Sequence, residues 1–410
     1  MAECIHRTTC RLCHSHQVEL GVHFEPTPPG DVYVSKDQVS IVQRTFPLDL
    51  YACQSCGSVQ LLDVVNPEIL YGNYIYQTSF SLGLPDHFKQ YVDEVLSLTG
   101  VKSGGLVIDI GSNDGTLLKC FQERGMKVLG IDPAPAAGKI ANERGVQTLQ
   151  ALFSKTMGEM IRRERGAVSM VTANNVIANI DDLDDLVQGI RALIEPDGFF
   201  VFETGYGLDL FEHQLIDVVY HEHLSYFTIG PLAKFFRRHG MKMAHAQYIA
   251  TKGGSIRCVI VSEESTFKTS DLVKQMVLNE EKKGMGQKIL CQQLSQFIAH
   301  KKKELDDFLN GLRQKGGTIA GYGASVGVTT LMYLFGLDKK LDFLVDDNPR
   351  RFGLFTPGHH LPVYSSQELY TRKPDYVLVL AWRYAQPILK RHQPYMDMGG
   401  RFIHFLPDLK

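Results

Sequence analysis

Two pairs of closely spaced cysteines stand near the start of the chain and could bind a metal ion. Cys10 and Cys13 form one Cys-x-x-Cys pair. Cys53 and Cys56 form the second pair after a gap of 39 residues, which requires an inserted loop. Two such turns bring four thiolates together and complete a tetrahedral zinc site. A redox-active pair would lie where a strand enters a helix, and neither pair does. We therefore expect one structural Zn²⁺ with no open coordination position.

A glycine-containing turn, DIGSNDG, runs from Asp109 to Gly115 at the end of an apolar strand. Glycine lets the backbone approach a ligand, and the following helix offers unpaired N–H groups. The pattern differs from the G-x-G-x-x-G of dinucleotide folds. Asp132 ends the next strand, where an acid can accept both ribose hydroxyls of a nucleoside. Because Asp109 would repel a pyrophosphate and attract a cation, we expect S-adenosylmethionine here. The alternative is a structural turn that binds nothing.

Four consecutive residues that carry or exchange protons form a third motif: Tyr220, His221, Glu222 and His223. As metal ligands, His221 and His223 would share one face of a strand. As acid/base groups, a histidine that titrates near neutral pH beside a carboxylate suits proton abstraction. The third hypothesis is a hydrogen-bonded structural patch. Four such residues in a row favour acid/base chemistry, because the carboxylate orients the imidazole and raises its basicity.

Alternating strands and helices must position these residues. Apolar segments typical of strands are found at 106–110, 127–132, 167–175 and 198–204, and again at 376–382 and 401–407. Helical periodicity lies between them, which is typical of a parallel sheet covered by helices. Residues 271–312 form a long charged helical stretch that Gly284 and Gly286 interrupt.

The predicted fold class is α/β in three domains. We expect an N-terminal Cys4 zinc module at 1–67, then a central Rossmann-like domain at 68–265 that binds S-adenosylmethionine. A helical linker at 266–315 leads to a smaller Rossmann-like α/β domain at 316–410.

Composition excludes several classes of protein. The 410 residues are 44% hydrophobic and 21% charged, as in ordinary globular chains rather than disordered ones. With 43 basic and 45 acidic residues the net charge is −2, which argues against nucleic acid and anionic membranes as partners. The N-terminus has no apolar signal segment, and the uncharged stretch 316–337 is too rich in glycine for a membrane span. We expect a cytoplasmic protein, as a monomer or a homodimer.

With the three motifs in this order, the sequence resembles the sugar-nucleotide C-methyltransferases. These enzymes methylate carbon 3 of NDP-4-keto-6-deoxy sugars in deoxysugar biosynthesis. The similarity extends over about residues 8–407 and includes both cysteine pairs. The other matching segments are YGNYIYQTS (71–79), DIGSNDGTLL (109–118), GIDPAP (130–135), ANNVIANIDD (173–182), YHEHLSYF (220–227), GGSIR (253–257), GYGAS (321–325), TPGHHLPV (356–363) and LAWRY (380–384).

The resemblance implies roles for individual residues. Tyr220, Glu222 and His223 would line the reaction centre, with His223 as the base. Besides Asp109, the residues that would surround the methyl donor are Gly111, Asn113, Asp132, Phe153 and Asn174. The residues that would contact a TDP- or GDP-linked sugar are Tyr74, Tyr76, Ser79, Asn175, Tyr322 and Ser325.

The chain departs from the family pattern at two places. Asn179 stands where the family usually has an active-site histidine. An amide cannot exchange a proton at neutral pH, but it can donate a hydrogen bond to an enolate oxygen. In addition, no lysine follows Ser325, which weakens a phosphate contact and suggests a different nucleotide or sugar.

The expected mechanism is methyl transfer to a carbanion equivalent. His223 removes the carbon 3 proton, Glu222 orients and balances the imidazole, and Tyr220, Asn179 and Asn175 are the candidate donors to the enolate oxygen. One alternative is an NAD(P)-dependent sugar-nucleotide enzyme that uses the turn at 321–327. Others are a methyltransferase for another nucleotide-linked substrate, metal-dependent catalysis through His221 and His223, and a non-enzymatic zinc module.

Overall fold

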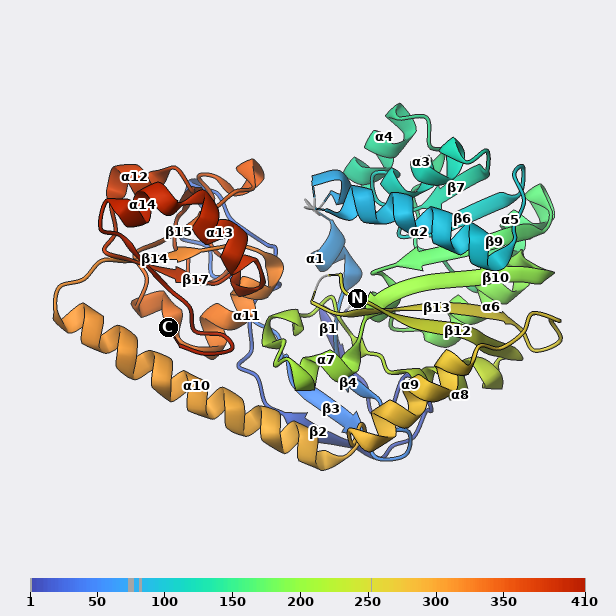
Figure 1. Ribbon diagram of the computed structural model, residues 1–410, viewed down its shortest axis with the longest axis horizontal. Helices are drawn as coiled ribbons and strands as arrows, with labels where there is room; N and C mark the ends of the chain where they lie inside the picture. Colours follow the sequence, from blue (N-terminus) through green and yellow to red (C-terminus); the bar gives the residue numbers. More distant parts are fainter. Residues whose placement is uncertain (1, 73–76, 81–82, 252, 410) are drawn as a thin grey trace.

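A computed structural model describes residues 2–72, 77–80, 83–251 and 253–409 of the chain. Two α/β lobes lie side by side, and strands from the N-terminal segment lie below and between them (Figure 1). The long helix α10 (Lys288–Gln314) runs along the base of the molecule from one lobe to the other (Figure 1). The predicted α/β class, with a cysteine-rich module and two sheets, is confirmed.

A seven-stranded sheet forms the first lobe in the order β12-β13-β10-β9-β6-β7-β8. Its strands are β6 (Leu106–Ile110), β7 (Lys127–Ile131), β8 (Thr148–Leu149), β9 (Val168–Asn174), β10 (Ile194–Gly205), β12 (Met241–Ile249) and β13 (Ser255–Ser262). All pairs are parallel except those that β13 makes with β10 and β12. The strand order reverses beside β6, so the carboxyl ends of β6 and β9 border the crevice where such sheets bind ligands.

Helices cover both faces of this sheet. They are α2 (Leu84–Thr99), α3 (Thr116–Glu123), α4 (Pro135–Glu143), α5 (Lys155–Arg165), α6 (Leu183–Leu193) and α8 (Ile229–Arg238). Helix α2 shows why they pack as they do, because its apolar residues recur every three to four positions. Phe88, Tyr91, Val92 and Val95 are buried on one face of α2 against the sheet.

The N-terminal segment forms two small sheets. Strand β1 (Cys4–His6) pairs with β5 (Asp63–Val65), and β2 (Val18–Val22), β3 (Leu50–Cys53) and β4 (Val59–Leu61) form an antiparallel sheet. The fourth strand of that sheet, β11 (Ser225–Tyr226), comes from the first lobe and pairs with β4. The segment that contains the Tyr-His-Glu-His motif is therefore built onto the cysteine-rich module.

The long gap between the cysteine pairs has a structural use. After β2 the chain crosses to the C-terminal lobe, where Val34 forms a bridge with Phe355. The Tyr33 hydroxyl donates to the carbonyl of Ala324 over 2.6 Å. The predicted inserted loop thus fastens the N-terminal segment to the second lobe.

The second lobe is a five-stranded parallel sheet in the order β16-β15-β14-β17-β18. Its strands are β14 (Ile319–Tyr322), β15 (Phe343–Asp346), β16 (Val363–Ser365), β17 (Tyr376–Val379) and β18 (Arg401–Ile403). Its helices are α11 (Val326–Leu334), α12 (Glu368–Arg372), α13 (Ala385–Arg391) and α14 (Gln393–Asp397), and short helices α1 (Pro67–Tyr71) and α7 (Gly207–Glu212) lie near the first lobe.

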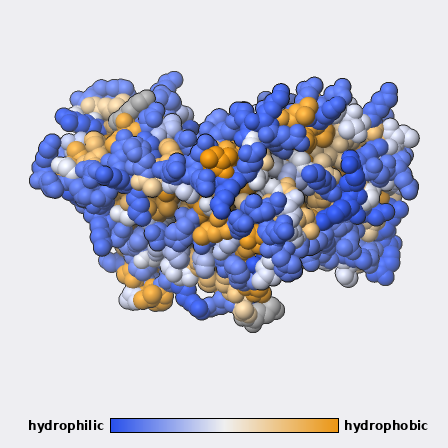
Figure 2. Space-filling model, turned by 90° about the horizontal axis from the view of Figure 1, so that it is seen from below, coloured by the Kyte–Doolittle hydropathy of each residue, from blue (hydrophilic) through white to orange (hydrophobic). Residues whose placement is uncertain are grey.

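The charged helical stretch is divided as expected. Helix α9 (Asp271–Lys282) ends before α10 begins, and Gly284 and Gly286 between them have φ angles of 74° and 81°. These left-handed conformations favour glycine and end the first helix. Within the described residues, no helix combines the length and the apolar character that crossing a bilayer requires. Hydrophilic residues cover most of the face seen from below, and apolar residues form separate patches on it (Figure 2).

Candidate active site and zinc centre

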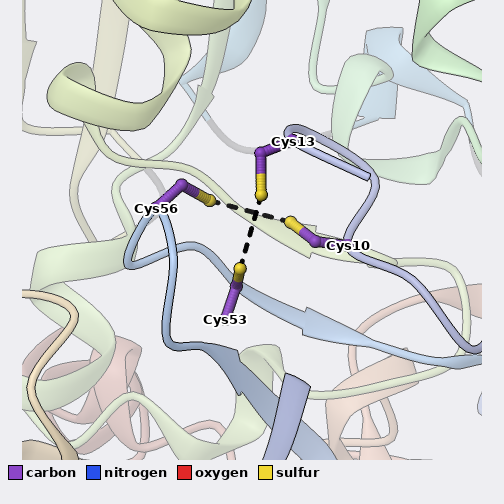
Figure 3. Close-up of side chains that lie close together, drawn as sticks. All are labelled: Cys10, Cys13, Cys53 and Cys56. Atoms are coloured by element: carbon purple, nitrogen blue, oxygen red, sulfur yellow. Dashed lines mark hydrogen bonds between the residues drawn. The ribbon is translucent and has the colours of Figure 1, made fainter. Parts of the chain in front are cut away.

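The four predicted zinc ligands lie together. Cys10 and Cys56 have Sγ atoms 3.7 Å apart, and those of Cys13 and Cys53 are 3.5 Å apart. All four sulfurs lie within 4.8 Å of one another and point to a common centre (Figure 3). Sulfurs at about 2.3 Å from a tetrahedral Zn²⁺ are about 3.8 Å apart, so the arrangement fits the ion. The four thiolates fill its coordination shell, which makes the zinc structural.

The DIGSNDG turn lies at the carboxyl end of β6, in the crevice of the first sheet. Gly111 has a φ angle of 72°, and a Cβ there would lie 2.8 Å from the Val176 side chain. Only glycine fits this close approach. The backbone N–H groups of Asn113 and Ala134 each donate to one oxygen of Asp132, both over 2.8 Å. Each oxygen keeps a lone pair, so Asp132 can still accept ribose hydroxyls.

Asp109 lies near the end of β6, where the DIGSNDG turn begins, and its side chain is buried, with 3% of the residue exposed. Thr172 donates its hydroxyl to Asp109 over 2.6 Å. Burial raises the pKa of the Asp109 carboxyl to about 7, and the Thr172 hydrogen bond only partly opposes that effect. A cation beside Asp109 would favour its ionised form.

Residues 77–80 lie against the turn. The backbone N–H of Thr78 donates to Asn113 Oδ1 over 2.9 Å, and that of Ser79 donates to Asp114 over 3.1 Å. Arg350, from the second lobe, donates to the side-chain oxygen of Gln77 over 2.9 Å. The structure thus brings Ser79 beside the predicted methyl-donor site. Tyr74 and Tyr76 lie outside the described residues.

The remaining residues predicted around the donor, Asn174 and Phe153, come from neighbouring strand ends, and so does Asn175, which is predicted to contact the sugar. Asn174 ends β9 and accepts the Glu203 N–H over 2.8 Å, while the N–H of Asn175 donates to the Glu203 carbonyl over 2.7 Å. Phe153 follows β8 and packs its ring edge against Gly189 of α6. All three lie at the carboxyl edge of the sheet, on the same side as Gly111 and Asp132.

Tyr220 and His223 form a hydrogen-bonded pair. The Tyr220 hydroxyl lies 2.8 Å from His223 Nε2, and the two ring centroids are 4.0 Å apart. His223 Nδ1 lies 2.9 Å from the carbonyl oxygen of Val218, which can only accept. Neutral His223 therefore carries its proton on Nδ1 and a lone pair on Nε2, where it accepts from Tyr220.

The Val218 carbonyl accepts a hydrogen bond from Nδ1 of this imidazole, because the tight backbone turn before the motif aims the carbonyl at the ring. The expectation that Glu222 also orients and balances the imidazole stays a prediction. Glu222 is 9% exposed, and its charge together with burial raises the pKa of Tyr220 well above its usual value. Tyr220 therefore stays a protonated donor.

His221 faces away from this pair. It is 1% exposed, and its Nε2 lies 3.2 Å from the carbonyl oxygen of Phe46 in the N-terminal segment. Burial lowers the pKa of His221 to about 4, so it is neutral at physiological pH. The structure does not assemble a metal site from His221 and His223: in the part of the chain that it describes, the four cysteines are the group with metal-binding geometry.

Asn179 is joined to the motif through the backbone. It ends the 3₁₀ turn η3 (Ile177–Asn179), and the Leu224 N–H donates to the Ala178 carbonyl over 2.8 Å. The Asn179 amide hydrogen-bonds to the hydroxyl of Tyr71 and opposes the rise in the Tyr71 pKa that burial and Glu222 cause. Asn179 Oδ1 is buried, and no described residue donates to it.

This arrangement bears on the expectation for Asn179. One N–H of the amide goes to Tyr71, which leaves the second N–H for the predicted contact with an enolate oxygen, and the acceptor oxygen has no described donor. Tyr71 lies in the segment 71–79 that matches the family, but the sequence predicted no role for it. Its position between Asn179, Glu222 and Asp132 depends on how α1 packs, which no local pattern reveals.

The second lobe contributes differently from the prediction. Tyr322 is 2% exposed, and its hydroxyl lies 3.0 Å from both Asp347 and His392, so it is held inside that lobe and does not reach the site. Ser325 is exposed at the start of α11. Arg383, in the LAWRY segment, instead reaches the first lobe and donates to Asp217 over 2.8 Å.

The turn after β14 is not open as a dinucleotide site would be. Gly327, in the first turn of α11, lies so close to Asp217 that a Cβ would collide with the Asp217 carbonyl oxygen. The Thr330 hydroxyl donates to the Val219 carbonyl over 2.5 Å. Backbone from the first lobe thus occupies the place where a pyrophosphate would approach this helix.

A largely parallel sheet with a glycine turn and an acidic residue at its switch point is the fold of an S-adenosylmethionine-dependent methyltransferase. Family models agree along the chain. They match a zinc binding domain at residues 10–71, a methyltransferase domain at 86–246 and a C-methyltransferase C-terminal domain at 250–407. The C-methyltransferase NovU of Streptomyces niveus is 30% identical over 401 residues, which cover 97% of this chain and 95% of NovU. The chain belongs to this C-methyltransferase family.

Other similarities are confined to part of the chain. A ubiquinone biosynthesis O-methyltransferase of Cupriavidus pinatubonensis is 25% identical over 165 residues, which cover 37% of this chain and 65% of that protein. The solved structure of the magnesium protoporphyrin IX methyltransferase of Synechocystis covers 47% of this chain and 90% of its own at 18% identity, with a TM-score of 0.35.

Proposed function

We propose that the enzyme methylates carbon 3 of an NDP-4-keto-6-deoxy sugar, linked to TDP or GDP, in deoxysugar biosynthesis. The observation that carries this proposal is the Tyr220–His223 pair. A carbon acid needs a basic nitrogen that can take its proton and a donor for the oxygen that becomes negative. Nε2 of His223 and the hydroxyl of Tyr220 offer these two groups 2.8 Å apart.

Before substrate binds, the Tyr220 hydroxyl engages the His223 lone pair. A keto oxygen next to Tyr220 competes for the same hydroxyl proton, and rotation about the phenolic C–O bond suffices to redirect it. That rotation frees Nε2, which then takes the carbon 3 proton as the enolate forms. The Val218 carbonyl stabilises the resulting imidazolium through its Nδ1–H bond.

When bound, S-adenosylmethionine supplies the methyl group, and its C–S bond breaks toward sulfur as the enolate carbon forms the new C–C bond. Asp132 would hold the ribose hydroxyls, and Asp109 would face the positive end of this cofactor. Gly111 and Asn113 would let the backbone approach S-adenosylmethionine, and Phe153 would flank its adenine base. Asn174, Asn175 and Ser79 would complete the wall between donor and sugar.

We also propose that the chain is divided into parts with separate roles, and that these parts begin at residues 68, 266 and 316. Residues 1–67 bind zinc, 68–265 carry out methyl transfer, 266–315 connect, and 316–410 hold the nucleotide end of the substrate, with Ser325 at its rim. The enzyme would act as a monomer or a homodimer, which light scattering distinguishes.

The direct test is incubation of the enzyme with S-adenosylmethionine and a panel of TDP- and GDP-linked 4-keto-6-deoxy sugars. We expect a mass gain of one methylene on at least one sugar and a new methyl signal on carbon 3. Because a 4-keto group acidifies carbons 3 and 5 alike, a methyl group on carbon 5 would contradict the assignment of carbon 3. No gain on any sugar would point to another nucleotide-linked substrate.

A variant tests the assigned base. His223→Asn should abolish exchange of the carbon 3 proton with deuterium, while S-adenosylmethionine binding, measured by calorimetry, stays unchanged. Tyr220→Phe is the matched control for the donor: it should retain measurable exchange because Nε2 is then free, but it should slow methylation. Full exchange in His223→Asn would move the base elsewhere.

A further inference from the structure

Arg11 stands between two zinc ligands in the sequence, yet its side chain is buried and only 2% exposed. Its guanidinium carries a positive charge, and Nε lies 2.9 Å from the Asp181 carboxylate. A buried charge is costly unless it is paired and hydrogen-bonded. The hydrogen bonds that Arg11 makes must therefore offset the cost of burying its charge.

Arg11 joins the cysteine cluster to β4. Its backbone N–H donates to the side-chain oxygen of Gln60 over 2.9 Å, and the Gln60 amide donates to Cys10 Sγ over 3.2 Å. Its Nη1 donates to the carbonyl of Leu61, the last residue of β4. Zinc ligation by Cys10 thus fixes the backbone next to Arg11 and the strand beneath it.

The same guanidinium reaches both segments of the active site. Nη1 donates to the carbonyl of Leu224, which directly follows His223, over 3.1 Å. Nε donates to Asp181, two residues beyond Asn179, over 2.9 Å.

The hydrogen bonds between these segments converge on the backbone of Leu224. Its N–H donates to the Ala178 carbonyl over 2.8 Å, and its carbonyl also accepts the Leu61 N–H over 2.9 Å. Leu61, Leu224 and Ala178 belong to three segments that are distant in sequence. Arg11 adds a charged bridge to two of these segments and to Asp181 in the third. Hydrogen bonds of this kind are stronger than those between neutral groups.

We infer that Arg11 is a positioning residue through which the zinc module fixes His223 and Asn179 relative to each other. The inference rests on the proposed role of His223 as the base. Arg11 touches neither cofactor nor substrate in this scheme: it acts through the Leu224 carbonyl and Asp181. The zinc module then contributes to the geometry of the active site and not only to folding.

Arg11→Met tests the inference, because methionine keeps much of the volume without the donors. Arg7→Met is the matched control: Arg7 donates to the same Asp181 oxygen over 3.0 Å, but its side chain is 23% exposed. We expect Arg11→Met to retain one zinc per chain by mass spectrometry. Hydrogen–deuterium exchange in the 218–228 peptide should become roughly tenfold faster, and Arg7→Met should leave it unchanged.

Kinetics supply a second readout. In Arg11→Met, kcat for the sugar that the wild type methylates should fall at least roughly tenfold, while the Kd for S-adenosylmethionine stays the same. Arg11→Lys should recover part of the exchange protection, since lysine keeps the charge but meets one acceptor at a time. If Arg11→Met does not fold, Arg11→Lys against Arg7→Lys gives the same comparison.

Unchanged exchange in the 218–228 peptide would overturn the inference, and so would equal acceleration in the Arg7 variant. Loss of zinc in the Arg11 variants would also overturn it, because Arg11 would then serve the metal site alone. Absence of methylation by the wild type would count against the proposed function instead. The exchange comparison decides the role of Arg11 in either case.

Discussion

Binding of S-adenosylmethionine should weaken as the pH falls below about 7, because Asp109 must ionise to face the cationic ligand. The carboxyl is buried, and its pKa is raised to about 7 without ligand. It is then half protonated at pH 7 and about nine-tenths protonated at pH 6. A ligand that binds only the ionised form therefore has a Kd roughly tenfold higher at pH 6 than at pH 8.

Isothermal titration calorimetry between pH 6 and pH 8 measures this ratio. Titrations in two buffers with different ionisation enthalpies should show release of about half a proton on binding at pH 7. Asp109→Asn is the control, because the ligand titrates identically with both proteins while the carboxyl is gone. The same pH dependence in the wild type and in Asp109→Asn would refute the reasoning.

The same carboxyl should affect the stability of the ligand-free protein. The pKa of Asp109 is higher in the folded chain than in the unfolded one. The contribution of this carboxyl to the free energy of unfolding is therefore fully present below about pH 4 and is lost as pH rises through 7. The full difference amounts to about 4 kcal/mol. Asp109→Asn should therefore raise the melting temperature more at pH 8 than at pH 5, and an equal effect at both would contradict this.

Three further predictions concern other sites. Arg257→Leu removes the guanidinium 2.7 Å from Glu203, whose side chain is 2% exposed and also lies 2.7 Å from His87, and should cost roughly 1–3 kcal/mol, seen as a lower melting temperature; adding Glu203→Leu should recover part of it, and no recovery would contradict the pairing. Cys13→Ser should eliminate bound zinc, measured by mass spectrometry, and expose residues 1–67 to proteolysis; retained zinc would argue against the four-cysteine site. Tyr71→Phe should release the Asn179 amide and lower kcat for the sugar roughly tenfold without changing the Kd for S-adenosylmethionine, and unchanged turnover would remove Tyr71 from the site.

Features that depend on local spacing were predictable from the sequence. Two Cys-x-x-Cys turns predict zinc because each turn fixes its own pair of sulfurs, whatever the rest of the fold does. The DIGSNDG turn and Asp132 predict a nucleoside site because parallel strands end at a common edge. Gly284 marks a helix break because its left-handed backbone disfavours other residues.

Contacts between distant segments were not predictable in this way. Val218 holds His223 through a backbone carbonyl that has no sequence signature. Tyr71 reaches Asn179 through the packing of α1. Arg383 reaches Asp217 across 166 residues only once the lobes have docked. Tyr322 lies in a motif shared with the family, but the packing of the second lobe turns its hydroxyl inward.

The close approach of Gly327 to Asp217 limits how the enzyme can be re-engineered. Any side chain at position 327 would force the two lobes apart just before the Tyr-His-Glu-His segment, so a distant change would appear as a catalytic defect. Chimaeras that exchange the C-terminal lobe between relatives to alter nucleotide preference must therefore keep Gly327 and Thr330, together with the Gly30 backbone that packs on Val326. This junction then decides which exchanges of the lobe yield an active enzyme.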